Sequence, residues 1–177
     1  MCRSTQMIKA LGAILIICGT SAWGISGVIK LRHRCSILAQ LTGAAATIRS
    51  EITTRLTPVP DLITRLTRET TAPCSLFFKN VEARLGDIGV RTLYDIWNGA
   101  LDNTPELSLS SDERNALREI PRALGRYDLE EQRLALSHTE RQLDSFLQRA
   151  REAQVRDSKI KGAVGVCAGI FIVLLLI

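Results

Sequence analysis

The sequence predicts an all-α protein, in which N-terminal and C-terminal transmembrane helices continue into a cytoplasmic bundle of about six helices. Two uncharged segments lead to this prediction: residues 10–29 and the final sixteen residues, 162–177. All 18 acidic residues lie between them, from Glu51 to Asp157. In this polar middle, apolar residues recur at the three- and four-residue spacing of helices, and no segment alternates as a strand does. We therefore expect a polar helical domain that is held to a membrane at both ends.

The first apolar segment, 8–29, is expected to cross the membrane as a helix, because a span needs about 20 apolar residues. A cleaved signal peptide is the alternative, with Arg3 and Lys9 as its charged region and a cleavage site after Ala22. However, the apolar run continues seven residues beyond Ala22 and then stops at three basic residues. This stop-transfer pattern favours a retained span; the three residues are Lys30, Arg32 and Arg34.

The second apolar segment, 160–177, is slightly short for a span unless Ile160 and a snorkelling Lys161 belong to it. The orientation follows from the basic residues that flank both segments, since these favour the cytoplasmic side. Six lie on the central side and two on the outer side. The middle domain, 30–159, is therefore predicted to be cytoplasmic. The six are Lys30, Arg32, Arg34, Arg156, Lys159 and Lys161, and the two are Arg3 and Lys9.

The first half of the middle domain is predicted to form three helices. Residues 35–56 continue directly from the membrane, and the two prolines of 57–60 end that helix. Thr57 is expected to cap the next, short helix, with Pro58 at its first position. A third helix follows Pro73. The apolar stripe of the first helix comprises Ile37, Leu38, Leu41, Ala45, Ile48, Ile52 and Leu56.

Two further helices have a recognisable start. Thr92 with Asp95 and Ser110 with Glu113 form capping boxes, in which each pair exchanges side-chain and backbone hydrogen bonds. Pro121 lies inside the second of these helices and is expected to kink or split it.

The longest helix is expected to start at Asp128, which can cap it, with Glu131 at its third position. No stop signal separates this helix from the apolar segment that follows, so one rod is predicted over 128–177. By the same reasoning, an N-terminal rod covers 7–56. Two rods that enter one membrane from the same side form an antiparallel pair, which carries about four short helices between them.

The sequence offers no recognisable catalytic, metal-binding or cofactor-binding pattern. His33 and His138 have no cysteine or serine partner at the spacing of a nucleophilic site. The five cysteines are scattered, and no glycine-rich phosphate loop is present. Arginines are mixed with acids rather than clustered with aromatics, which argues against nucleic-acid binding. We therefore expect a protein that is not an enzyme and has no cofactor, no metal and no small-molecule substrate.

Gly165 and Gly169 have the four-residue spacing that lets two membrane helices pack closely. Membrane helices also tolerate glycine without such a role, so both interpretations stay open.

Five segments occur in the order typical of one bacterial family, between two apolar chain ends. The chain resembles the stage III sporulation protein AB family, which is encoded in the eight-protein mother-cell operon of endospore-forming bacteria. The similarity covers essentially the whole chain from Met7. The segments are MIKALGAILIICGTSAWG, SEITTRLTPVPDLITRL, PCSLFFKNVEARL, TLYDIWNGAL and ALGRYDLEEQRLAL.

The resemblance implies a function that the residues alone do not. Members are similar to the cytoplasmic helical bundle of the inner-membrane platform protein of type II secretion systems and type IV pili. The chain is then expected to be a platform subunit of a secretion-like channel between mother cell and forespore, in the mother-cell membrane facing the forespore. The expected partners are a cytoplasmic ATPase of the same operon and other channel subunits. The alternative is a membrane-tethered regulatory adaptor outside any channel.

Docking of these partners is expected to use charged residues that lie opposite the apolar stripes. The candidates are Arg65, Arg68, Arg84, Glu113, Arg118 and Arg122.

Overall fold

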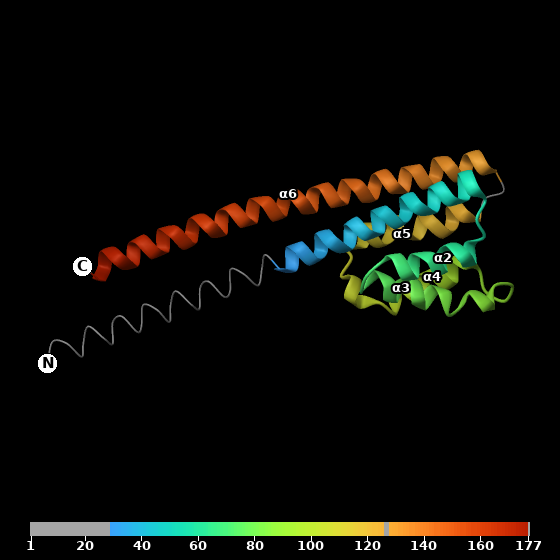
Figure 1. The fold of residues 1–177 in the computed structure, drawn as a ribbon, viewed down its shortest axis with the longest axis horizontal. Coiled ribbons are helices and arrows are strands. Elements are labelled where there is room, and N and C mark those ends of the chain that lie inside the picture. Colours follow the sequence, from blue (N-terminus) through green and yellow to red (C-terminus); the bar gives the residue numbers. More distant parts are fainter. Residues whose placement is uncertain (1–28, 126–127, 177) are drawn as a thin grey trace. The chain divides into compact units, whose positions relative to one another are not determined.

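The structure, a computed structural model, describes residues 29–125 and 128–176, with side chains as far as Arg156. These residues form helices joined by short connections (Figure 1). The described residues contain no strand, only one isolated bridge between Ile88 and Arg91. The prediction of an all-α fold with about six helices is confirmed.

The helices follow one another with few residues between them. The first is helical over residues 29–50 and ends in one π-helical turn, which is the element η1. The elements in order are η1 (Glu51–Arg55), α2 (Val59–Glu69), α3 (Cys74–Glu82), η2 (Leu85–Asp87), α4 (Leu93–Asp102), η3 (Pro105–Leu107), α5 (Ser111–Leu124) and α6 (Leu129–Leu176).

Contacts divide the chain into two units, and the compact bundle comprises Arg34–Arg149. The helix α6 belongs to both units, because it continues without a break for 48 residues from Leu129 to Leu176. The prediction of one rod at this end is confirmed for the helical backbone. The N-terminal rod is described only from residue 29, so its earlier part lies outside the described residues.

Most of the two predicted membrane spans lies outside the residues or the side chains that the structure describes. Apart from Ile29, the segment 8–29 lies outside the described residues, and the segment 160–177 lies beyond the described side chains. A search of the described part of the chain finds no helix with the length and apolar character that crossing a membrane requires.

Both predicted capping boxes are confirmed. The Thr92 hydroxyl accepts from the Asp95 backbone N–H at 3.2 Å, and the Asp95 carboxylate accepts from the Thr92 N–H at 3.3 Å. In the second box the Ser110 N–H donates to Glu113 at 2.8 Å. Asp128 also caps α6 as predicted, because its carboxylate accepts from the Glu130 N–H at 2.9 Å. These helix starts depend on residues only two or three positions apart, so the sequence alone is enough to predict them.

The prediction for Thr57 and Pro58 is wrong, and of the two outcomes predicted for Pro121 the split does not occur. Helix α2 begins at Val59 with Pro58 as its cap residue, and the Thr57 hydroxyl donates to the Glu51 carboxylate at 2.8 Å instead of capping α2. Pro121 does not split α5, which continues to Leu124. The interior proline removes one backbone donor, while its ring is buried in the bundle.

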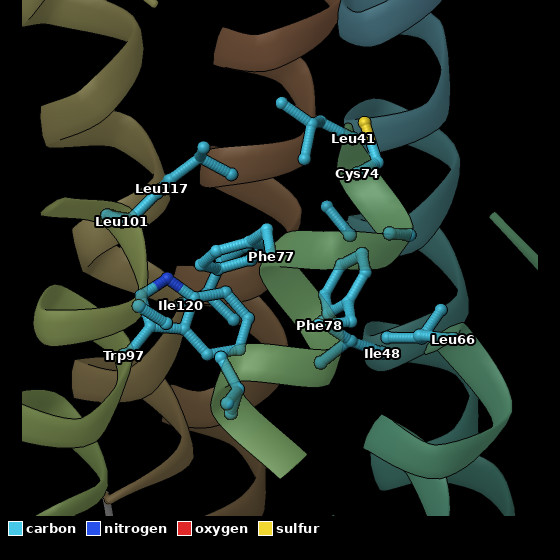
Figure 2. Close-up of a cluster of buried hydrophobic side chains, with 14 of the residues drawn as sticks. Leu41, Ile48, Leu66, Cys74, Phe77, Phe78, Trp97, Leu101, Leu117 and Ile120 are labelled. Atoms are coloured by element: carbon cyan, nitrogen blue, oxygen red, sulfur yellow. The ribbon is translucent and has the colours of Figure 1, made fainter. Parts of the chain in front are cut away.

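The core is centred on three aromatic side chains, as Figure 2 shows. The ring of Phe77 lies 5.1 Å from that of Trp97 and meets it edge-on at 83°, and the rings of Phe77 and Phe78 are 5.0 Å apart. Such tilted arrangements suit the ring quadrupoles. Residues of the other helices surround these rings, so one core holds all six helices; among them are Leu41, Ile48, Leu66, Leu101, Leu117, Ile120 and Leu136.

The first helix departs from its predicted stripe only at its end. Ile37, Leu41 and Ile48 are buried as expected, but Leu56 is 68% exposed. The π turn inserts an extra residue per turn and so rotates the following side chains away from the α-helical register. Glu51, the first residue of this turn, is buried, and Leu56, which follows the turn with a φ of +53°, is exposed.

Candidate functional surface

Two carboxylates of the bundle, Glu51 and Glu113, are buried, and each one joins elements that are distant in sequence. Such groups are rarely buried without partners, because desolvating a charge is costly. Their hydrogen-bond partners therefore show which elements of the bundle these two carboxylates connect.

Glu51 joins the end of the first helix to α2. Its Oε1 accepts from Nη1 of Arg55 and from Nη1 of Arg65, each at 2.9 Å. Its Oε2 accepts from the hydroxyl of Thr57, which directly follows the turn. The Thr57 hydrogen bond is the largest cause that lowers the pKa of the Glu51 carboxyl, and the charges of the two arginines add to it against desolvation. The carboxylate thus stays ionised and fixes the turn between the two helices.

Glu113 joins the start of α5 to the first helix. Besides its capping bonds with Ser110, it accepts from Nη2 of Arg34 at 2.5 Å. Arg34 also donates to the carbonyl of Ser108, just before α5. The Glu113 side chain is only 3% exposed. Its charge is therefore used inside the bundle and is not free on the surface, while its part in docking stays a prediction.

A third ion pair joins the first helix to α6. Arg49 Nε lies 2.7 Å from Glu140 Oε2, and both side chains are partly exposed. Partly exposed pairs contribute only up to about 1 kcal/mol each, so these contacts align the helices more than they stabilise the fold. The first helix is thus fastened to α2, α5 and α6, through Glu51, Arg34 and Arg49 respectively.

Three of the predicted docking arginines are also used within the bundle. Arg65 pairs with Glu69 at 2.6 Å in addition to Glu51. Arg118 donates to the side chain of Asn98 at 3.1 Å. Arg122 pairs with Glu119, donates to the Tyr94 hydroxyl at 2.9 Å and lies over its ring at 4.7 Å. Arg122 therefore ties the end of α5 to the start of α4.

The other two arginines make no ion pair among the described residues. Arg68 is exposed at the end of α2. Arg84 lies just after α3, and its side chain extends to Gly99 of α4. Its Nη1 lies 2.9 Å from the position that a Cβ atom would occupy on that glycine. Of the six predicted residues, two lie on α2, one lies after α3 and three lie on α5. Three of them reach α4, namely Arg84, Arg118 and Arg122.

No cluster of three or more His, Cys, Asp or Glu side chains among the described residues could hold a metal ion. The Cys74 thiol is fully buried, and its Sγ lies 3.8 Å from the carbonyl of Ile37. Burial raises the pKa of this thiol to about 12, so it is protonated at neutral pH and packs as a small apolar group.

Exposed apolar residues are the feature that our sequence analysis missed. Ile88 is 51% exposed and Val90 is 92% exposed, in the connection between α3 and α4. The sequence signal is an apolar residue on each side of Gly89, whose φ of +112° makes the turn.

Comparisons with known proteins agree on one family. The family model described as stage III sporulation protein AB matches residues 9–177. The stage III sporulation protein AB of Bacillus subtilis (strain 168) is 27% identical over 175 residues, which cover 96% of this chain and 99% of that protein. A solved structure of stage III sporulation protein AB (SpoIIIAB) is similar with a TM-score of 0.64 and 23% identity. It covers 70% of this chain and 98% of its own, and it shows the same fold.

Proposed function

The chain belongs to the stage III sporulation protein AB family, and we propose that it is a membrane platform subunit of a secretion-like channel complex between mother cell and forespore. It carries out no catalysis in this role and is required for forespore development. Its bundle lies in the cytoplasm, and its apolar ends lie in the mother-cell membrane that faces the forespore.

The continuous helix α6 is the observation that carries this proposal. It begins inside the bundle at Leu129 and continues to Leu176 without a break, so its whole length is about 72 Å at a rise of about 1.5 Å per residue. Its last part is the uncharged segment 162–176. A helix whose backbone continues from a packed bundle into an apolar end connects the two directly, with no loop between them. This is what a platform between a cytoplasmic motor and a membrane channel needs.

The ion pairs between the first helix and its neighbours also support the platform role. Ion pairs at Arg34, Arg49 and Glu51 connect it to three other helices. A force applied anywhere on the bundle is therefore shared by the two helices that lead to the chain ends. Close packing of the membrane segments at Gly165 and Gly169 would complete this coupling; both glycines lie beyond the described side chains.

The partners in this proposal are the cytoplasmic secretion-type ATPase of the same operon and the other channel subunits. Of the predicted docking residues, Arg68 and Arg84 are the best suited to bind them, because neither makes an ion pair among the described residues. Arg65, Arg118 and Arg122 have partners inside the bundle and would have to exchange them.

The test is co-purification of the full chain, co-expressed with the ATPase and the sibling membrane subunits, in mild detergent. We expect it to elute with them, and a strain that lacks it to form no heat-resistant spores. Elution of the chain alone, with normal sporulation of the deletion strain, would refute the platform role and favour a lone regulatory adaptor.

Topology is tested separately by labelling an introduced thiol. Ser145→Cys places one at an exposed position of α6, whereas the native Cys74 is buried and unreactive. In intact cells a membrane-impermeant maleimide should leave Ser145→Cys unlabelled. Labelling from outside would contradict a cytoplasmic bundle.

A further inference from the structure

The net positive charge of the chain lies entirely outside the bundle. In the sequence, Arg34–Arg149 contains 15 basic and 16 acidic residues, so the bundle is close to neutral. The rest of the chain contains eight basic and two acidic residues, which gives it a net charge of +6, against +5 for the whole chain. The partner that this surplus charge can bind is therefore expected beside the apolar chain ends and not on the bundle.

Most of this charge lies on two short stretches, 29–33 and 150–161, which we call the flanks. Each flank joins the bundle to one of the two apolar segments in the sequence. The flanks hold six of the eight basic residues, together with both acids, Glu152 and Asp157. The six basic residues are Lys30, Arg32, Arg151, Arg156, Lys159 and Lys161.

The described basic side chains of the flanks are exposed and make no ion pair among the described residues; they are Lys30, Arg32, Arg151 and Arg156. Glu152 lies four residues before Arg156, which is the spacing of a helical ion pair, but the two do not pair. Arg34, by contrast, already bonds Glu113 inside the bundle. The basic charge of the flanks is thus available to a partner.

Exposed apolar side chains lie beside these charges in both flanks. Ile29, directly before Lys30, is 60% exposed, and Val155, directly before Arg156, is 55% exposed. An apolar side chain next to a basic one suits the boundary between the headgroups and the acyl chains of a bilayer. The apolar group enters the acyl region there, while the long basic side chain reaches the headgroups.

Helix geometry places the charge at headgroup depth. Helix α6 continues into the uncharged segment that begins at Gly162, and Arg156 precedes that segment by about 9 Å at a rise of about 1.5 Å per residue. The headgroup layer is about 5–7 Å thick on each side of a bilayer, and charge acts about 8 Å beyond it at physiological ionic strength. Arg156 lies within this range, and Arg151, at about 16 Å, lies at its edge.

We propose that the two flanks bind the headgroups of anionic phospholipids. Lys30, Arg32 and Arg156 contact the headgroups, and Ile29 and Val155 enter the acyl boundary beside them. Because α6 continues from its flank into the bundle without a break, the bound lipid also fixes how deep α6 enters the membrane. The inference deepens the platform role and rests on its membrane location, since it names the class of lipid that the chain selects.

A protein with an acidic surface is a poorer occupant of the flanks. The basic side chains lie within a few residues of the apolar segments, so such a protein would have to displace lipid headgroups to reach them. Free phosphate supplies the charge but nothing that covers Ile29 and Val155. An anionic lipid supplies both the negative charge and the apolar surroundings.

The lipid selectivity of the purified full chain tests the proposal. The chain is reconstituted in phosphatidylcholine vesicles with spin-labelled phosphatidylglycerol or spin-labelled phosphatidylcholine, and electron paramagnetic resonance measures the fraction of each label that the chain immobilises. One basic side chain near the headgroups favours an anionic lipid by up to about fivefold, which equals about 1 kcal/mol. We expect at least about a twofold preference for phosphatidylglycerol, which falls as NaCl is raised from about 0.05 M to about 0.5 M.

Replacing the basic residues of the flanks should lower this preference. Lys30→Gln with Arg32→Gln should remove about half of it, and Arg156→Gln a smaller part, because each removes contacts that depend on charge. Glutamine is a good helix former and these side chains are exposed, so the helix content should stay unchanged by circular dichroism.

Matched controls remove the same charges from the bundle. Lys79→Gln with Arg91→Gln replaces one lysine and one arginine, and Arg141→Gln replaces an arginine on α6 itself. All three side chains are exposed and make no ion pair among the described residues. Neither control should change the preference for phosphatidylglycerol, because these residues lie far from the apolar segments in the sequence.

Four other outcomes would overturn the proposal. Equal immobilisation of both lipids by the unaltered chain would refute the lipid site and leave the membrane location standing. An equal loss in the flank variants and the controls would show that net charge, and not the flanks, selects the lipid. If the chain enters no vesicles and immobilises no lipid, the membrane location and the platform role fail as well. If the flank variants keep the preference but no longer elute with the sibling subunits, the flanks bind a protein instead.

Discussion

Removing the Glu113 carboxylate should destabilise the bundle through two separable contributions. Ser110→Ala removes only the capping half and should cost about 1 kcal/mol. Glu113→Ala keeps the bond from its backbone N–H to the Ser110 hydroxyl but loses the bond from the Ser110 N–H. It also loses the charge-assisted bond from Arg34, which is worth about 1.5–3 kcal/mol where it is fully desolvated. Because the Arg34 side chain is 40% exposed, that bond is discounted, and the total should be about 2–3 kcal/mol.

Urea unfolding of the full chain in nanodiscs, followed by far-ultraviolet circular dichroism, measures these differences. A double-mutant cycle between Arg34→Ala and Glu113→Ala isolates the coupling between the two side chains. We expect about 1 kcal/mol, since one partner is buried and the other is half-exposed. The control cycle is Glu130→Ala with Arg133→Ala, an exposed pair within α6, which should couple by about 0.3–0.5 kcal/mol.

Equal coupling in the two cycles would refute this reasoning. The first helix would then not be fastened to α5 through Arg34, and the capping box would account for the whole effect of Glu113. A loss of about 1 kcal/mol in Glu113→Ala, matching Ser110→Ala, would lead to the same conclusion.

Three further predictions test the core and its titratable groups. Phe77→Ala should cost about 4–5 kcal/mol in urea unfolding, because it removes a fully buried ring that contacts two others, whereas Leu76→Ala on the exposed side should cost under about 1 kcal/mol. The Glu51 pKa is lowered from 4.5, so its contribution to stability should be present above about pH 4.5 and lost as the pH falls through the folded pKa; Glu51→Gln should flatten the unfolding free energy between about pH 3 and 5. Cys74 should resist alkylation in the folded chain at about pH 8 and react once urea unfolds it, and fast labelling without urea would contradict its burial.

Local patterns in the sequence predicted the helix starts because the partners are three residues apart. Thr92 and Asp95 need only each other, and Asp128 needs only the backbone that follows it. The apolar stripes were predicted for the same reason, since a helix places residues of regular spacing on one face. At the end of the first stripe, Ile52 is partly buried and packs against the core, and only Leu56 is exposed.

Contacts between distant residues could not be predicted in this way. The capping role of Glu113 was local and predictable, but its burial depends on Arg34, 79 positions earlier. The sequence alone likewise predicts that Arg65 is an unpaired surface charge. Its ion pair forms only because α2 packs beside Glu51. Charge opposite an apolar stripe indicates exposure only when no other helix covers it, and pattern alone does not show which helices are neighbours.

The π turn at Glu51–Arg55 connects the buried charge of the bundle with its exposed apolar end. Glu51 lies three residues after the buried Ile48, on the face of the first helix that packs against the core, and there its carboxylate binds Arg65 and fixes α2. Leu56 follows the π turn in a left-handed conformation and is 68% exposed.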